Sequence, residues 1–196
     1  FGLRIEDTDI LRNTEGAEQK LQDDVKWLGI GADEGPDAGG PFAPYRQSER
    51  RAFYAAALAR LEAAGVIYPC TCSRKDILMA ASAPNAGDDD EPIYPGTCRP
   101  KQGVKSEVSG VRQAAAPTLP DTPHLTPGTR INWRFRVPDD ETISFVDGNF
   151  GPQQFVAGKD FGDFVVWRHD VVPAYQLSVT VDDAAMKITE VVRGAD

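Results

Sequence analysis

The sequence predicts an α/β fold whose middle is a β-rich segment that carries a metal site. Segments near both ends, 3–9 and 188–193, have strand-like apolar patterns with charged residues at their carboxyl ends, where open α/β sheets bind ligands. All three cysteines fall within 70–98, and clean strand patterns follow within 131–168. Together these observations favour an α/β domain that is interrupted by an insertion.

The chain of 196 residues is long enough for one domain with a smaller domain inserted. Its net charge of -9 counts against a nucleic-acid partner, but the charge is unevenly distributed. Residues 99–136 carry 7 Lys and Arg against 2 Asp and Glu, a net +5, whereas the segments on either side each carry a net -7. This basic segment is either a contact for a phosphate backbone or a solvated loop, and both interpretations stay open.

The sequence has neither an apolar run long enough for a membrane span nor a secretory leader, so we expect no membrane partner. The odd number of cysteines favours a reducing compartment, most simply the cytoplasm. We also expect a monomer. The chain begins inside a strand pattern without an initiator methionine, so we expect it to be an internal portion of a longer protein.

The first elements follow from apolar spacing and capping residues. Leu3–Asp9 reads as a strand that delivers acidic side chains to its carboxyl end. Asn13 or Thr14 is expected to cap the helix that follows, and Gly29 to end it. Residues 31–44 are too rich in Gly and Pro for regular structure and predict a surface loop.

A second helix is predicted to begin at Ser48 as its cap and to end at Gly65. Residues 66–68 then lead into the cysteines, and Ser73 is expected to cap a short helix. The remaining segments are a long irregular loop at 112–128, strands at 131–137, 143–148 and 164–168, a helix or turn from 173, and a buried strand at 188–193.

The cysteines have the spacing of metal ligands. Cys70 and Cys72 are too close in sequence for an ordinary disulfide but suit two thiolates on one ion, and Cys98 returns after a turn-rich loop. The pattern predicts a structural zinc site that needs a fourth ligand, for which Tyr94 and the acidic run 88–91 are candidates. The alternative is three unrelated buried thiols.

Several long motifs resemble the catalytic domain of the glutamyl-tRNA synthetase family, a class I aminoacyl-tRNA synthetase family. They cover nearly the whole chain in the family's order: Leu3–Asp9, Trp27–Pro41, Pro44–Arg50, Tyr175–Asp183 and Ile188–Gly194. The resemblance implies a Rossmann-like catalytic domain with an inserted zinc-bearing, β-rich subdomain. Residues 1–67 would be its first part, 68–165 the insertion and acceptor-type subdomain, and 166–196 the return to the catalytic domain.

Within this family the chain is more similar to the branch of glutamyl-Q tRNA(Asp) synthetases than to the enzymes that charge tRNA(Glu). Gly162–Val166 and Ala174–Val179 follow the wording of that branch, and Pro100 stands where other zinc-bearing members have a histidine. Its zinc pattern, Cys-x-Cys followed by Tyr-x-x-x-Cys, is matched by Cys70, Cys72, Tyr94 and Cys98.

The resemblance to this branch implies activation of L-glutamate with ATP and Mg²⁺, and transfer of the glutamyl group to the queuosine base of tRNA(Asp). One alternative is a glutamyl-tRNA synthetase that charges tRNA(Glu), and another is a non-catalytic, zinc-stapled module that binds tRNA. The HIGH-type and KMSKS-type motifs that handle ATP are absent from the sequence, so we expect this portion to be inactive alone.

The resemblance also implies roles for individual residues. Glu6 would bind the ammonium group of glutamate, Arg193 its side-chain carboxylate and Tyr175 a further polar atom, while Asp196 aligns near a position that meets the ATP ribose. Spacing alone allows another interpretation, in which Glu6 and Arg193 form salt bridges at strand ends and Tyr175 is an aromatic residue of the core. No protein nucleophile is expected, because the reaction depends on positioning and charge stabilisation.

The zinc site would be structural, because four protein ligands leave no position open for water. Coordination by Tyr94 requires its hydroxyl to ionise far below the ordinary pKa of a phenol, and a nearby cation makes this plausible. Arg74, Arg99 and Lys101 are close enough in sequence to supply that cation.

Overall fold

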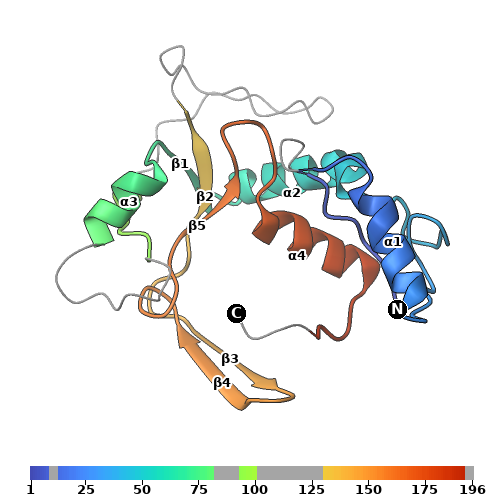
Figure 1. Ribbon diagram of the computed structural model, residues 1–196. Helices are drawn as coiled ribbons and strands as arrows, with labels where there is room; N and C mark the ends of the chain where they lie inside the picture. The colour runs from blue at the N-terminus through green and yellow to red at the C-terminus, as the bar shows by residue number, and fades with distance from the viewer. Residues whose placement is uncertain (9–12, 82–92, 101–129, 193–196) are drawn as a thin grey trace. The chain divides into compact units, whose positions relative to one another are not determined.

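The computed structural model describes residues 1–8, 13–81, 93–100 and 130–192 (Figure 1). Two compact units divide the chain, residues 1–57 with 172–196 (the first unit) and 58–171 (the second unit). The elements are α1 (Ala17–Trp27), η1 (Gln47–Arg50), α2 (Arg51–Ala63), β1 (Ile67–Cys70), α3 (Arg74–Ala81), β2 (Asn132–Phe135), β3 (Thr142–Asp147), β4 (Gly151–Val156), β5 (Phe164–Trp167) and α4 (Tyr175–Met186). The three-part domain division expected from the sequence remains a prediction.

Helix α1 begins differently from the prediction. Gly16 is the N-cap residue, with φ 77°, and no side chain caps the helix, so the expected cap by Asn13 or Thr14 is wrong. The Asn13 amide instead donates to the Asp7 carbonyl, and the Thr14 carbonyl accepts the N–H of Ala17. The predicted end is confirmed, because Gly29 follows the helix with φ 72°, a backbone conformation that glycine adopts at little cost.

The two terminal segments that were predicted to be strands do not form regular sheet in the described residues. The first makes single parallel bridges, Gly2 with Glu34 and Ile5 with Arg46. Residues 188–192 form no strand, and Val192 is 89% exposed, so the predicted buried strand is wrong over these residues. Within the described residues no strand pairs with this apolar run. An apolar pattern predicts a strand but does not show whether a partner strand is present.

The Gly- and Pro-rich segment 31–44 forms turns and single bridges, as predicted. Its fold depends on Gly40, which has φ 140°. A Cβ at this position would lie 2.2 Å from the Tyr45 hydroxyl, which donates a hydrogen bond to Glu34 at 2.6 Å. Glycine is therefore required here both for its φ and for the close approach of the Tyr45 side chain.

The expected cap at Ser48 is also wrong. Ser48 lies inside η1, where its hydroxyl donates to one oxygen of Asp7 at 2.6 Å and its N–H donates to the other at 2.8 Å. Asp7, from a segment distant in sequence, thus satisfies a donor at this helix start. The predicted end of α2 is confirmed at Gly65, whose φ is 67°.

A buried carboxylate organises the first unit. Asp182 on α4 is 0% exposed and accepts hydrogen bonds from Gln47 Nε2 (3.0 Å), Arg50 Nε (2.6 Å) and Tyr54 Oη (2.8 Å). Burial, followed by the hydrogen bond to Asp182, raises the pKa of Tyr54, so its hydroxyl remains a donor. These bonds join α4 to η1 and to the first turn of α2.

The second unit contains an antiparallel sheet in the order β1-β2-β5 and a separate hairpin of β3 and β4 (Figure 1). Strands were predicted for β2, β3 and β5, whereas β4 was missed because Gly151 and Pro152 open it and its pattern is weak. Trp133 pairs with Trp167 across β2 and β5, and both side chains are buried. Within the described part of the chain, no helix combines the length and apolarity of a membrane span.

Helix α3 begins with the predicted cap. The Ser73 hydroxyl accepts the N–H of Asp76 at 3.2 Å, and the Asp76 carboxylate accepts the N–H of Ser73 at 2.7 Å. This reciprocal arrangement satisfies two donors at the helix start. The hydrogen bonds from Ser73 lower the pKa of Asp76, which keeps the cap charged at neutral pH.

We predict that Asp182→Ala lowers the free energy of unfolding of the first unit by about 3–5 kcal/mol, because it leaves the buried Arg50 guanidinium without its carboxylate. Urea titration followed by circular dichroism measures the effect. The matched control is Asp183→Ala, which removes a partly exposed partner of Arg4 and is expected to cost no more than about 1 kcal/mol. Equal losses of unfolding free energy in the two variants would contradict the claim that burial makes the Asp182 contacts the more stabilising ones.

Candidate functional site

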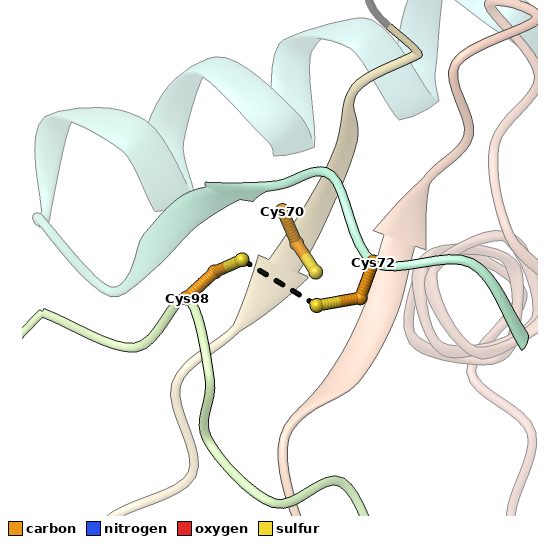
Figure 2. A group of neighbouring side chains, drawn as sticks. All are labelled: Cys70, Cys72 and Cys98. Atoms are coloured by element: carbon orange, nitrogen blue, oxygen red, sulfur yellow. Dashed lines mark hydrogen bonds between the residues drawn. The ribbon is translucent and has the colours of Figure 1, made fainter. Parts of the chain in front are cut away.

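The three cysteines predicted to bind a metal come together in the second unit. Their sulfurs all lie within 4.8 Å of one another, and Figure 2 shows the three side chains converging from β1, the turn after it and the Cys98 segment. Cys72 Sγ is 3.6 Å from Cys98 Sγ, and all three thiols are free. The alternative of three unrelated buried thiols is therefore wrong.

The hydroxyl of Tyr94 completes this group. It lies 3.4 Å from Cys70 Sγ and 3.6 Å from Cys72 Sγ, and it accepts the Cys98 N–H at 2.8 Å. Tetrahedral zinc with bonds of about 2.3 Å to sulfur and about 2.1 Å to oxygen would separate two sulfurs by about 3.8 Å, and sulfur from oxygen by about 3.6 Å. The observed separations fit this geometry. The acidic run 88–91, the other candidate for the fourth ligand, lies outside the described residues.

Local structure brings these four side chains together. Cys70 ends β1 and is 0% exposed, in a cluster with Tyr68 and Tyr94. Gly162 allows the Tyr94 segment to approach, because a Cβ there would lie 2.7 Å from a methyl of Ile93. The turn that closes through the Arg99 N–H and the Gly96 carbonyl presents Cys98 to the other thiols.

Burial and hydrogen bonding affect the pKa values of Cys72 and Cys98 differently. Burial raises the pKa of Cys72 to about 11. Burial also acts to raise the pKa of Cys98, but the hydrogen bonds from the Thr71 N–H and the Tyr94 hydroxyl outweigh it and lower the pKa to about 7. Burial raises the pKa of Tyr94, so metal coordination through its oxygen requires compensation by nearby positive charge.

That positive charge comes from a residue that was not predicted. Arg134 Nε donates to Cys70 Sγ at 3.2 Å, and its guanidinium lies 3.9 Å from the centre of the Tyr94 ring. Of the cations expected from sequence proximity, Arg74 is exposed and Arg99 pairs with Asp139 and Asp163. Lys101 lies outside the described residues.

The signal that could have found Arg134 is the register of the sheet. Tyr68 is opposite Arg134 in the antiparallel pairing of β1 and β2, and Cys70 is two residues beyond Tyr68. Arg134 and Cys70 therefore project on the same face as diagonal neighbours. This register cannot be read from either strand alone.

The residues expected to bind glutamate are only partly described. Glu6 accepts a long hydrogen bond from Arg4 at 3.4 Å, its side chain being 43% exposed, and Arg4 also donates to Asp183 at 2.7 Å. Tyr175 is the first residue of α4 and is 56% exposed. Both belong to the first unit, whereas Arg193 and Asp196 lie outside the described residues. The four assigned roles remain predictions.

With this fold and geometry established, comparison with known proteins identifies the class to which the chain belongs. Residues 1–196 match the family model described as tRNA synthetases class I (E and Q), catalytic domain. The chain belongs to this family. The catalytic-domain resemblance seen in the motifs is thus confirmed along the whole sequence.

Individual relatives narrow the resemblance. The chain is 46% identical to a glutamyl-Q tRNA(Asp) synthetase of Symbiobacterium thermophilum, over 100% of this chain and 55% of that protein. It is 41% identical to glutamate–tRNA ligase 2 of Nitrosococcus oceani, over 100% of this chain and 38% of that protein. The crystal structure of a glutamate tRNA ligase from Elizabethkingia meningosepticum, in complex with its amino acid, has a TM-score of 0.69 and 27% identity, and the match covers 96% of this chain and 36% of that one.

Proposed function

We propose that the protein containing this chain activates L-glutamate with ATP and Mg²⁺ and transfers the glutamyl group to the queuosine base of tRNA(Asp). The observation that carries this proposal is the set of Cys70, Cys72, Tyr94 and Cys98, whose four ligand atoms lie close together. The same spacing is the pattern that resembles the glutamyl-Q branch. The higher identity to a relative with that name supports the proposal. The chain spans about half of that relative, so the activity proposed is that of the longer protein.

The second candidate is glutamyl-tRNA synthetase activity toward tRNA(Glu). It is favoured by the 41% identity to a glutamate–tRNA ligase over the whole chain. The two candidates share the activation of glutamate and differ in the nucleophile that accepts it. The accepting hydroxyl belongs to the cyclopentene ring of queuosine in the first candidate and to the tRNA terminus in the second.

The first step in both is attack of the glutamate α-carboxylate on the α-phosphorus of ATP, which forms glutamyl-adenylate and releases pyrophosphate. In this proposal the residues bind and orient reactants and no side chain becomes a nucleophile. The Glu6 carboxylate pairs with the substrate ammonium, the Arg193 guanidinium grips the side-chain carboxylate and the Tyr175 hydroxyl fixes the orientation. Asp196 is assigned to the ATP ribose.

We further propose that the four-residue set holds a structural zinc ion. Three sulfurs and one phenol oxygen at these separations suit a tetrahedral ion, and they leave no position for a reacting water. The ion would tie β1 to the segments of Tyr94 and Cys98, which are otherwise connected to β1 through long intervening sequence. Its role would be to hold the subdomain in one conformation. We assign the basic segment 99–136 to contact with tRNA, except for Arg99 and Arg134, which have partners within the protein.

We expect the intact protein to catalyse glutamate-dependent exchange between ATP and pyrophosphate without any tRNA. Exchange only in the presence of tRNA(Glu) would support the second candidate, and no exchange under either condition would contradict both.

Glu6→Gln should raise the KM for glutamate roughly ten- to hundredfold, because it removes a charge-assisted contact with the ammonium group. Glu15→Gln, which changes an exposed carboxylate in the same unit, is the matched control and should leave KM unchanged.

We expect about one zinc ion per chain in the purified protein, with Cys98→Ser lowering both the zinc content and the melting temperature of the second unit. Elemental analysis and calorimetry measure the two quantities. The matched control is Thr71→Ser, which changes an exposed residue between Cys70 and Cys72, and this variant should retain the zinc ion. A Cys98→Ser protein with full zinc content and unchanged melting would contradict the assignment.

A further inference from the structure

The buried cation beside the cysteines in the second unit is Arg134. Arg134 on β2 is 6% exposed, and no ion pair joins it to a carboxylate within the described residues. Its contacts are the sulfur of Cys70, the ring of Tyr94 and the main-chain carbonyl of Asp163, to which Nη1 donates at 3.0 Å. Burial of a guanidinium costs several kcal/mol unless hydrogen-bond acceptors and negative charge lie near it, and the groups that surround Arg134 therefore matter.

The thiol and phenol groups are the source of that charge when a divalent ion binds. Three thiolates and one phenolate around Zn²⁺ would carry a net charge of about -2, and a cation beside the partly buried site would stabilise that charge. Arg134 touches two of the four ligand residues directly. The positive charge of Arg134 and the negative charge of the zinc-bound ligands would therefore stabilise each other.

The geometry of the guanidinium matters as well as its charge. One planar group donates through Nε to the Cys70 sulfur, presents its face to the Tyr94 ring and donates through Nη1 to the Asp163 carbonyl. A lysine ammonium is a point charge that cannot make these three contacts in one orientation.

The third contact is itself held in place. The Asp163 carboxylate accepts hydrogen bonds from the Tyr68 hydroxyl at 2.5 Å and from the Val137 N–H at 2.9 Å. These bonds hold Asp163 to β1 and to the segment that follows β2. Arg134 is thus oriented by protein groups that are not themselves ligand residues.

We propose that Arg134 is the positioning residue of the metal site: its guanidinium holds the Cys70 sulfur and the Tyr94 ring in the orientation in which both residues can bind zinc. This inference rests on the zinc site of the proposed function. It extends that function because it gives Arg134, a strand residue far in sequence from the ligands, a role in placing Tyr94 as the fourth ligand.

The test is zinc affinity in the intact protein, measured by competition with a chromophoric chelator. We expect Arg134→Met to weaken zinc binding about 10- to 100-fold, the usual effect of removing a partner of a metal ligand, and Arg134→Lys to lie between it and the parent protein. Arg136→Met, two residues away on the same segment, is the matched control and should bind as tightly as the parent. Arg134→Met or Arg134→Lys proteins that match the parent within twofold would overturn the proposal.

A second measurement separates this role from a general loss of packing. In the cobalt-substituted parent protein we expect the absorption spectrum of three sulfurs and one oxygen, and Tyr94→Phe should alter it. Arg134→Lys should alter it in the same direction, and adding Tyr94→Phe to Arg134→Lys should produce little further change in zinc affinity. Fully additive effects would overturn the proposal even if Arg134→Met fails to fold. Failure of the parent protein itself to bind zinc would instead refute the zinc assignment.

Discussion

The buried guanidinium of Arg134 is the interaction on which the arrangement of the second unit depends. It contacts Cys70 on β1, the Tyr94 segment and the main chain at Asp163, three parts of the chain separated by long stretches of sequence. Because such a cation is costly to bury, each of these partners must be present and correctly oriented at once. These contacts are compatible only with a register that places Arg134 diagonally opposite Cys70, which is the register observed for β1 and β2.

The first unit is built on the same constraint with the charges reversed. There a buried carboxylate, Asp182, collects donors from η1 and α2 and holds α4 against them. In both units one buried charged group has partners from several segments. The apolar pattern of those segments alone does not determine their position relative to one another. We infer that these polar networks select one arrangement of otherwise small cores, a role that buried charges have in some proteins.

The sequence could predict the features that depend on local chemistry. Gly29 and Gly65 end their helices because a left-handed residue is needed there, and Ser73 caps α3 through its own neighbour Asp76. The spacing of the three cysteines likewise predicts their convergence. Each of these follows from residues within a few positions of one another or from a ligand pattern with a fixed chemistry.

Features that depend on distant partners could not be predicted. Asp7 rather than Ser48 supplies the acceptor at η1, and the terminal apolar run reaching Val192 remains exposed over the described residues. Arg134 was missed because strand alternation assigns it to the face opposite Trp133 without indicating what covers that face. Family resemblance, not spacing, selected Tyr94 over the acidic run, and the position of its hydroxyl beside two thiols is consistent with that choice.

The proposed zinc ligands and the residues proposed to bind glutamate belong to different units, so we assign recognition of RNA and activation of glutamate to separate parts of the chain. Both belong to one reaction only if the activated glutamate reaches the queuosine base. The most direct measurement is transfer of labelled glutamate by the intact protein to purified tRNA. We expect label on tRNA(Asp) that contains queuosine and none on the same tRNA with guanosine at that position. Label on tRNA(Glu), with none on either form of tRNA(Asp), would contradict it.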